Sequence, residues 1–341
     1  MSNVKVSIVT TVYNAEKDLP RLLDSMKAVK NQEIEFFLID NGSSDNSYEI
    51  CKKYADEDSR FTIYQIKENI GYIRARNLGI EKCSGNYVGF CDSDDFLELG
   101  GYDIAIKKIE ETNCDFFIGA YRLLDGNNEF LKTPPFEEGV YNSEQVKSLS
   151  PLFFGPYAGK ERLHGFVWKN VYRKEILLKN NIRFNEVLKP YEDQIFNVDV
   201  MKNSSVIVSS NTVLYDYVVN LESITAKLVS NFSVKEEYER IVNLYKEYEK
   251  RITNKIEKEA LCNHVLSSLY VIFLNCAKGK GNIKTYKNEF KTVVKKSFID
   301  VAVKNSSKKQ NTVLGFVKTC MRFKTFGLLI KIIKISIKNR G

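Results

Sequence analysis

The chain contains 341 residues, of which 43% are hydrophobic and 28% are charged, and its formal net charge is +8. This length and composition allow one large folded domain or two, and they exclude an intrinsically disordered chain. The seven cysteines are odd in number and include no Cys-x-x-Cys pair, which argues against a disulfide framework and indicates reduced thiols in a cytoplasm.

The sequence contains no run of about 18 apolar residues and no basic leader followed by an apolar stretch. We therefore expect neither a membrane-spanning helix nor a secretory signal. The two histidines, His164 and His264, are too few and too far apart for a zinc site. The excess positive charge lies mainly in residues 301–341, which contain ten Lys or Arg and no Asp or Glu.

The first 120 residues alternate between two periodicities. Short apolar runs predict strands at residues 4–9, 36–39, 61–65, 87–91 and 115–120. Segments with helical periodicity, beginning near residues 18, 48, 74 and 102, separate these strands. This alternation predicts an α/β fold with a doubly wound, mostly parallel sheet flanked by helices.

The rest of the chain divides into three parts. Residues 125–138 are polar and contain two prolines, which predicts a hairpin or loop, and residues 206–217 resemble a strand. From residue 234 onward the pattern is helical and rich in lysine. We therefore expect a nucleotide-binding and catalytic domain at 1–230 and a helical region at 231–341.

Three turns that follow predicted strands carry polar side chains, at residues 10–14, 40–45 and 92–95. Parallel α/β sheets bind ligands just beyond the carboxyl ends of their strands, and those ends lie at one edge of the sheet. The three turns together therefore predict a ligand pocket at that edge.

The turn at residues 92–95 places three carboxylates, Asp92, Asp94 and Asp95, within four residues. Clustered carboxylates repel one another unless a cation neutralises them. A Mg²⁺ or Mn²⁺ ion that carries a substrate diphosphate would do so, because Mg²⁺ is usually held by one or two carboxylates with phosphate oxygens and water. The alternative is a solvated turn that caps the next helix.

These turns, in this order, resemble the inverting glycosyltransferases of family 2, which have the GT-A fold. The resemblance is specific over the first 100 residues and weaker to about residue 225. The matching segments are 6–14, 39–47, 69–77 and 85–95, and then 167–173, 191–193 and 217–225.

The resemblance implies a nucleotide-sugar donor, a divalent metal and inversion of the anomeric carbon. Asp94 is the expected metal ligand, with Asp92 as a contact to the metal or ribose and Asp95 as a helper at the sugar. The remaining donor-binding residues that it implies are Thr11, Tyr13, Asp40, Asn41, Arg76 and Ser93. For Arg76 the alternative is an ordinary arginine on a helix surface.

Asn41 departs from the usual family pattern, in which a second aspartate accepts a hydrogen bond from uracil N3–H. An amide oxygen can still accept that bond, so a UDP-sugar remains the expected donor. Thymine and guanine become more credible, because they also present a ring N–H beside a carbonyl.

An inverting displacement needs a carboxylate that takes the proton of the acceptor hydroxyl. Asp193 is the expected base, and Glu192 is expected to orient the acceptor or nearby backbone, because the family's catalytic Glu-Asp pair falls here. The alternative is that both residues only cap the helix that follows them. His164 and Trp168 could line the acceptor side, although a single Trp among apolar neighbours is equally expected in the core. Residues Ser223 and Thr225 belong either to a loop over the diphosphate or to a plain turn.

The last residues, 313–340, place apolar side chains at 326, 330, 333 and 337 and lysines at 324, 331, 334 and 338. This spacing predicts a basic amphipathic helix, which suits an anionic membrane surface. Docking on the chain's own helical region, or on a second copy in a homo-oligomer, are the alternatives. No nucleic-acid reader motif is present, so nucleic acid is not an expected partner.

The leading interpretation is therefore a cytoplasmic-face glycosyltransferase that builds a surface polysaccharide on a glycan or lipid-linked acceptor. A nucleotidyltransferase is a second interpretation, but residues 10–14 lack the Gly-rich basic loop that it would need after the first strand. A third is a module that binds sugar nucleotides or glycans without catalysis. Turnover of a donor would distinguish the first from the third.

Overall fold

The computed structural model describes residues 5–189, 191–220, 233–278, 296–307 and 312–322, together with positions 286, 288, 289, 325, 327, 328 and 330–333. The chain forms two compact units. The first combines Met1–Leu149 with His164–Asn220, and the second combines Ser150–Leu163 with Leu221–Gly341. The expected domain boundary at residue 230, and the segment with Ser223 and Thr225, lie outside the described residues.

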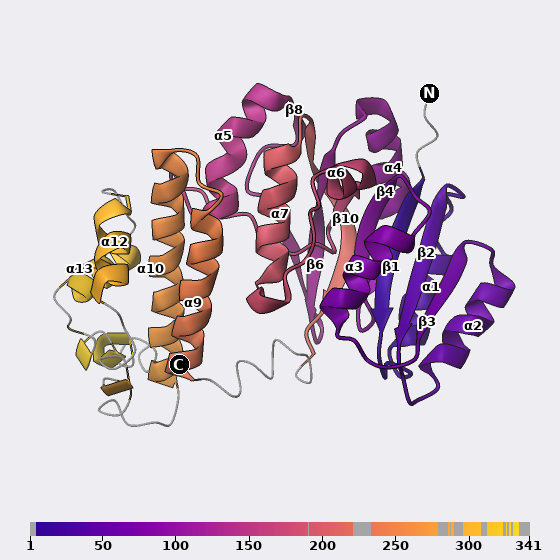
Figure 1. Cartoon of the computed structure of the whole chain (residues 1–341), viewed down its shortest axis with the longest axis horizontal. Coiled ribbons are helices and arrows are strands. Elements are labelled where there is room, and N and C mark those ends of the chain that lie inside the picture. The colour runs from indigo at the N-terminus through magenta and orange to yellow at the C-terminus, as the bar shows by residue number, and fades with distance from the viewer. Residues whose placement is uncertain are drawn as a thin grey trace. The chain divides into compact units, whose positions relative to one another are not determined.

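In the first unit, strands and helices alternate from the N-terminus as far as β4 (Figure 1). The elements of this unit are β1 (Val6–Val12), α1 (Leu19–Lys27), β2 (Ile34–Asn41), α2 (Ser47–Glu57), β3 (Phe61–Ile66), α3 (Tyr72–Lys82), β4 (Tyr87–Asp92), β5 (Phe96–Leu97), α4 (Gly101–Thr112), β6 (Phe116–Asp125), β7 (Asn128–Lys132), β8 (Gly139–Tyr141), α5 (Ser143–Phe154, whose last residues belong to the second unit), β9 (Asn170–Arg173), α6 (Lys174–Lys179), the short 3₁₀ helix η1 (Glu186–Leu188), α7 (Glu192–Asn203) and β10 (Ile207–Val218).

All these strands belong to one sheet, in the order β3-β2-β1-β4-β9-β6-β10-β5, with β7 beside β6 and β8 beside β10. The strands β3, β2, β1 and β4 are parallel to one another, as are β6 and β10. Strand β9 lies between β4 and β6 and is antiparallel to both. The predicted α/β fold is confirmed, but the sheet is mixed rather than mostly parallel.

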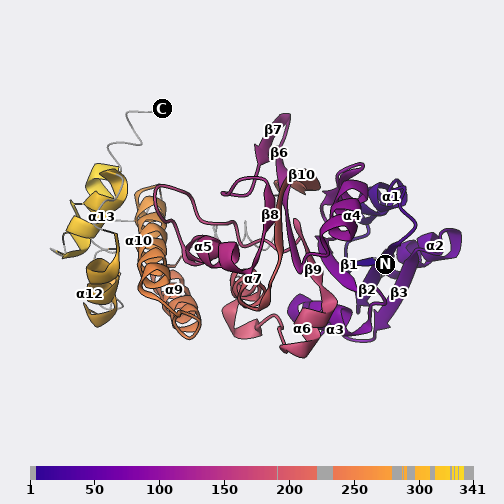
Figure 2. The same ribbon diagram turned by 90° about the horizontal axis from the view of Figure 1, so that it is seen from above.

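Helices cover both faces of this sheet, with α1 and α4 on one face and α3 and α6 on the other (Figure 2). Helix α1 places Leu19, Leu22, Leu23 and Met26 on one side, and all four are buried in the core against that face. On the other face, α3 lies very close to β1, because a Cβ atom at its Gly79 would lie only 2.3 Å from Val9. This close packing fixes the position of α3 over the sheet.

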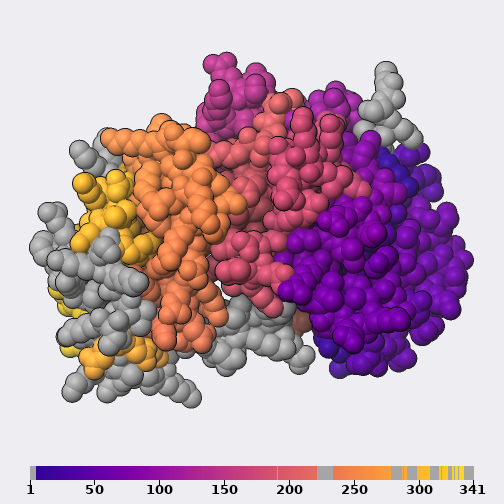
Figure 3. Space-filling view, viewed as in Figure 1, coloured from indigo at the N-terminus to yellow at the C-terminus, as the bar shows by residue number. Residues whose placement is uncertain are grey.

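The second unit is helical, as the sequence predicts from residue 234. Its described helices include α9 (Val234–Glu249), α10 (Lys255–Lys278), α12 (Lys296–Asn305) and α13 (Thr312–Arg322). Helix α10 packs against the other three, and α9 and α10 present a continuous surface in the space-filling view (Figure 3).

One described helix is long and apolar enough, by length and composition only, to cross a membrane. This segment is Lys255–Ala277 in α10, and 67% of its most apolar window is buried inside the protein. Such burial is also typical of a core helix in a soluble unit. This segment differs from the expectation of no spanning helix, because its charged and polar residues interrupt any run of apolar side chains in the sequence.

The predicted basic helix at 313–340 is only partly described. Val317 and Met321 on α13 are buried, and so are Ile330 and Ile333 on the predicted apolar side. Lys331, on the predicted basic side, is exposed. These described positions favour the alternative in which the apolar side packs on protein, and the lysines at 324, 334 and 338 lie outside the described residues.

Candidate functional site

The three polar turns meet at one edge of the sheet, where the parallel strands β1, β2 and β4 end. Thr11 on β1 pairs with Asp92 on β4, and the next residue, Val12, pairs with Asp40 on β2. Side chains from segments far apart in the sequence are thus side by side, as the strand pattern predicts. Thr11 is half-buried, whereas Tyr13 in the following turn is 49% exposed.

Hydrogen bonds join the turn after β1 to the turn after β2. The Asn14 side-chain oxygen accepts a hydrogen bond from the Ser44 backbone N–H at 2.8 Å, and the Asn14 N–H donates to Ser43 Oγ at 3.1 Å. Asn14 adopts a left-handed conformation with φ of 49°, which an asparagine tolerates better than most residues. These bonds hold the two turns as one unit beside the carboxyl ends of the strands.

Asn41 is buried and already hydrogen-bonded within the protein. Its Nδ2 donates to Asn69 Oδ1 at 3.0 Å, and its Oδ1 accepts from the Ile70 N–H at 3.0 Å. The next residue, Gly42, has a φ of 77°, and a Cβ there would lie 2.8 Å from the Asn69 backbone nitrogen. Asn41 therefore fixes the 69–71 segment against the sheet edge, a role that sequence reasoning did not predict.

Asp40 lies beside Asn41 and is also buried, with 1% of its surface exposed. Its Oδ1 accepts a weak hydrogen bond from the Ser43 N–H at 3.3 Å, and its buried Oδ2 has no hydrogen-bond partner among the described residues. A buried carboxylate oxygen without a partner is costly, and ligand-binding sites are one common place for it. Asp40 is therefore a suitable acceptor for a donor group of a bound ligand.

Asp95 is the most buried carboxylate of the acidic turn. It accepts hydrogen bonds from the Tyr215 hydroxyl and from the Val218 N–H, both at 2.7 Å. Burial, with the charges of Asp94 and Asp92, raises the pKa of Asp95 to about 8. Because both its oxygens are engaged by β10, Asp95 anchors the turn to that strand.

Asp92 and Asp94 are the more accessible carboxylates of this turn, and Ser93 between them is half-buried. Burial and the charge of Asp92 raise the pKa of Asp94 above its usual value. Two hard oxygen ligands that repel each other fit a divalent ion such as Mg²⁺ or Mn²⁺ that also binds phosphate and water. Among the described residues, no group of three or more His, Cys, Asp or Glu side chains could hold a metal alone, so further ligands would come from substrate and water.

Arg76 is buried and contacts two carboxylates from distant parts of the chain. One terminal nitrogen donates to Asp92 Oδ1, and the other donates to Asp193 Oδ1 at 3.2 Å. Its guanidinium also lies over the rings of Tyr72 and Phe184, at 5.2 and 5.7 Å from their centroids. Arg76 is therefore not a surface residue, and it joins the acidic turn to the start of α7.

Glu192 and Asp193 occupy the first turn of α7, as the sequence predicts. Glu192 is buried, and its Oε1 accepts a hydrogen bond from the Tyr72 hydroxyl at 2.6 Å, whereas its Oε2 has no partner within the described part of the chain. The Asp193 Oδ2 accepts a long hydrogen bond from the Val167 N–H at 3.4 Å. Burial raises the pKa of Asp193 to about 7, with Arg76 lowering it and Glu192 raising it. A carboxylate with a pKa near 7 is suited to accept a proton at neutral pH.

Aromatic rings pack beside Tyr215, whose hydroxyl holds Asp95 of the acidic turn. Trp168 is 3% exposed and stacks on Tyr215, with ring centroids 4.3 Å apart, which matches the core alternative for this residue. His164 is half-buried, and the plane of its ring is parallel to that of Phe166, a residue that is 39% exposed. Phe166 was not predicted from the sequence. The alternation of aromatic residues at 164, 166 and 168 is the signal that would have indicated it.

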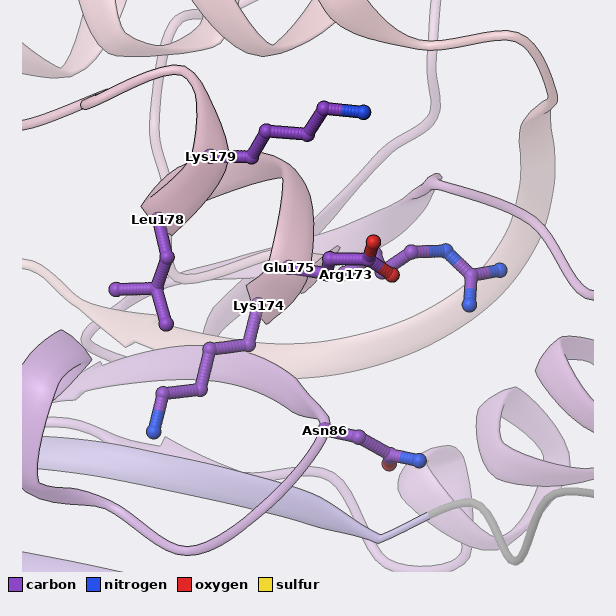
Figure 4. A pocket seen from close by; sticks show the side chains of 6 residues that line it. All are labelled: Asn86, Arg173, Lys174, Glu175, Leu178 and Lys179. Atoms are coloured by element: carbon purple, nitrogen blue, oxygen red, sulfur yellow. The ribbon is translucent and has the colours of Figure 1, made fainter.

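A separate hollow lies at the opposite, amino-terminal end of β4 (Figure 4). Its volume is about 730 Å³, and Asn86, Arg173, Lys174 and Lys179 line it with two neighbours. Arg173 donates to Asp115 Oδ1 at 2.9 Å, and Lys174 donates to a backbone carbonyl at 2.5 Å. Because it lies at the amino-terminal end of β4, this hollow is not part of the site at the carboxyl ends.

Comparison with known proteins gives one family. Residues 7–161 match the family described as Glycosyl transferase family 2. The uncharacterized glycosyltransferase EpsJ of Bacillus subtilis is 24% identical over 98% of this chain and 96% of its own length. The poly(ribitol-phosphate) beta-N-acetylglucosaminyltransferase TarP of Staphylococcus aureus is 27% identical over 72% of this chain and 76% of its own.

Among solved structures, S. aureus TarS residues 1–349 in complex with UDP-GlcNAc is similar in fold. The TM-score is 0.69 at 20% sequence identity, and the match covers 98% of this chain and 92% of that chain. The match includes the C-terminal helices as well as the sheet, because it extends over almost the whole chain. The GT-A fold expected from the sequence is thereby confirmed.

Proposed function

We propose that this chain, a glycosyltransferase whose residues 7–161 match Glycosyl transferase family 2, transfers a sugar from a nucleotide sugar to a hydroxyl of a cell-surface polymer or its lipid-linked precursor, with inversion. The name of the relative TarP, which acts on poly(ribitol phosphate), supports a polymer acceptor. The UDP-GlcNAc bound to TarS supports a UDP-sugar as the donor.

The observation that carries this proposal is the double contact of Arg76. It places Asp92, on the donor side, and Asp193, the proposed base, at the two ends of one guanidinium. An inverting transfer needs the leaving diphosphate and the proton acceptor on opposite sides of one sugar carbon. A planar arginine fork can hold two such carboxylates at a defined separation.

The donor would lie along the edge formed by β1, β2 and β4. Asp40, with its unpaired buried oxygen, would accept a hydrogen bond from the nucleoside, and Thr11 would lie beside it. Asp92 and Asp94 would hold a Mg²⁺ or Mn²⁺ ion, which when bound offsets the charge that develops on the departing diphosphate. Asp95 keeps the turn in place through Tyr215.

Asp193 would take the proton of the acceptor hydroxyl. Its pKa of about 7 allows it to be ionised before transfer and protonated afterwards. The hydrogen bonds from Arg76 and from the Val167 N–H orient the carboxylate. Glu192 supports this arrangement through Tyr72 rather than by contact with the reacting atoms.

The test is a thermal-shift screen of the full chain with Mn²⁺ against nucleoside diphosphates and their sugar conjugates. A ligand at 100 times its Kd adds about 2.7 kcal/mol of stability, so the correct base and sugar would stand out. Release of the nucleoside diphosphate from the selected donor would then show turnover. Donor binding without any turnover, in the presence of cell-wall polymer or membrane extract, would instead favour a non-catalytic binding module.

A further inference from the structure

We propose that two buried asparagines, Asn170 and Asn197, are positioning residues for the proposed base Asp193 and act through the backbone of residues 165–167. The inference rests on the proposed glycosyl transfer, and it concerns how the base is held rather than which groups react. Asn170 is fully buried and Asn197 is 1% exposed, and sequence reasoning singled out neither role.

Asn197 and Asp193 contact the same backbone segment from one helix. They are four residues apart on α7, so their side chains leave the same side of the helix, one turn apart. Asn197 Nδ2 donates to the Gly165 carbonyl oxygen at 2.7 Å, and the Val167 N–H donates to Asp193 Oδ2 at 3.4 Å. The segment is therefore attached to α7 at two points, one of which is the base itself.

Asn170, at the start of β9, holds the same segment. Its Nδ2 donates to the Phe166 carbonyl oxygen at 3.0 Å, and its backbone N–H donates to the Val167 carbonyl oxygen at 3.1 Å. The carbonyl oxygens of residues 165, 166 and 167 thus each accept a hydrogen bond from one of the two asparagines. These bonds fix the successive peptide planes of the segment.

The orientation of both amides follows from the groups that face them. A backbone carbonyl can only accept, so the amide atom that faces a carbonyl oxygen of the segment must be nitrogen. Each remaining amide oxygen has a donor: Asn170 Oδ1 accepts from Lys169 Nζ at 3.2 Å, and Asn197 Oδ1 accepts from the Tyr172 hydroxyl at 2.7 Å. The two amides also contact each other, because Asn170 Nδ2 lies 3.3 Å from Asn197 Oδ1. The pair is therefore a consistent, buried hydrogen-bond network.

Gly165 packs directly against the first turn of α7. A Cβ atom at this position would lie 2.4 Å from Gln194 Cγ and 3.1 Å from Gln194 Cα, and Gln194 is the residue after the base. The segment is thus packed against α7 as well as hydrogen-bonded to it. A shift of the segment would move the Val167 N–H relative to the Asp193 carboxylate.

Buried asparagines commonly do no more than pair buried polar groups in a core. The peptide between Phe166 and Val167 distinguishes this pair, because its carbonyl accepts from Asn170 and its N–H donates to Asp193. A peptide group is planar, so one rigid plane joins an asparagine to the base, and the direction of one hydrogen bond sets the direction of the other. A base must keep its orientation to meet the acceptor hydroxyl, which gives this contact a catalytic consequence.

The first test variant is Asn170→Asp. Its carboxylate keeps an oxygen for Lys169 Nζ, so this buried amine retains a partner and the fold should be preserved. The new side chain has no N–H for the Phe166 carbonyl, whose oxygen it would repel. We expect the turnover at saturating donor to fall roughly 10- to 100-fold and the donor Kd to change by less than about twofold.

The second variant is Asn197→Leu, which retains a side chain of similar size and removes the donor to the Gly165 carbonyl. It should give the same loss of turnover with the same donor Kd. Turnover is measured as release of nucleoside diphosphate from the nucleotide sugar that the thermal-shift screen selects, with Mn²⁺ and membrane extract.

Hydrogen exchange provides a second measurement that needs no substrate. In the full chain without ligand, mass spectrometry of the fragment that contains residues 164–168 should show faster exchange in both variants than in the wild type. The matched control is Tyr87→Phe, since Tyr87 is buried and its hydroxyl donates to the Cys114 carbonyl at 2.8 Å, at the amino-terminal end of β4. This control removes one buried hydrogen bond and should lower stability to urea, while turnover and exchange at 164–168 stay unchanged.

Four results would overturn the proposal. These are unchanged exchange at 164–168 in both variants, faster exchange with wild-type turnover, an equal loss of turnover in Tyr87→Phe, and loss of the fold in both variants, which would make the pair a core element only. If one variant unfolds, the other decides.

Failure of this inference can be separated from failure of the proposed function. If the wild type turns over a nucleotide sugar and both folded variants do so equally, only the positioning inference fails. If the wild type binds and turns over no nucleotide sugar in the screen, the proposed function fails and this inference fails with it.

Discussion

The carboxylates of Asp92 and Asp193 are held at the two terminal nitrogens of one guanidinium, that of Arg76. One carboxylate ends strand β4 and the other begins helix α7, so Arg76 fixes the distance between the donor edge and the proposed base. Lysine could not replace this contact, because an ammonium group is a point charge without the planar fork. This relationship leads to the first two predictions.

Asp193→Asn should abolish proton transfer while leaving donor binding intact. An asparagine preserves the shape of the side chain but cannot accept the proton. We expect kcat to fall by roughly 10²–10⁴, the usual contribution of a positioned general base, with the donor Kd changed little. Steady-state kinetics and donor titration measure the two effects. Normal turnover with weakened donor binding would contradict the assignment, and Asp56→Asn on the exposed surface of α2 is the control.

The pH profile should report the same carboxylate. Because the pKa of Asp193 is raised to about 7 and the base works only when deprotonated, kcat should fall as the pH falls through about 7. Arg76 lowers this pKa, so Arg76→Lys should move the acidic limb of the profile to higher pH and reduce kcat. Arg74→Lys on the same helix is the control, since Arg74 is exposed in a surface ion pair. An unshifted profile in Arg76→Lys would show that Asp193 does not limit the rate.

Asp94→Asn should remove metal-dependent donor binding without unfolding the protein. The amide loses the negative charge that a divalent ion requires, and it also relieves repulsion from Asp92. We therefore expect thermal stability without donor to be unchanged or slightly higher. The additional thermal shift that Mn²⁺ gives with donor should disappear. Donor binding with unchanged Mn²⁺ dependence would remove the metal assignment.

Asn41→Asp should destabilise the chain rather than simply restore the usual family residue. An aspartate has no Nδ2 donor. One of its carboxylate oxygens would instead face Asn69 Oδ1, the atom to which Asn41 Nδ2 donates at 3.0 Å. Leaving a buried polar group unpaired costs about 1–3 kcal/mol, more where a charge is involved. Urea unfolding measures this change, and Asn128→Asp at the exposed start of β7 is the control. Unchanged stability with altered preference for the nucleobase would show that Asn41 contacts the base directly.

Substitution of Lys331, Lys334 and Lys338 by Gln tests the basic C-terminal segment. Each lysine near an anionic surface adds about 1 kcal/mol of attraction, so the triple variant should bind phosphatidylserine vesicles on the order of 100-fold more weakly. The buried residues Ile330 and Ile333 remain in place, so the fold should be retained. Vesicle sedimentation and thermal unfolding measure the two effects.

The control for this variant removes three exposed lysines elsewhere, at positions 52, 53 and 107. Both variants lower the net charge of the protein by three. An equal loss of vesicle binding in the two variants would therefore mean that the C-terminal lysines do not form a specific membrane-binding surface. Intact vesicle binding by the C-terminal variant would also contradict the membrane interpretation.

The candidate site illustrates what could be read from the sequence. The buried strand that ends in Asp92, the acidic residues after it and the Glu-Asp pair at the start of α7 are all local patterns, and the structure places them as expected at strand or helix ends. The role of Asn41 could not be read in this way, because it depends on contacts with Asn69 and Ile70, which are distant in the sequence.

The sequence by itself determined the alternation of the longer strands and helices over the first 120 residues, the edge of the sheet where polar turns gather, and the helical character of the C-terminal region. These features follow from hydrophobic periodicity and turn residues, which act over a few positions. Only the tertiary structure decided that β9 enters the sheet antiparallel, that Arg76 is buried between Asp92 and Asp193, and that Asp95 is held by Tyr215. Strand pairing and burial of charge depend on which distant segments meet, because a four-residue strand or a single arginine carries too little local pattern to specify its partner.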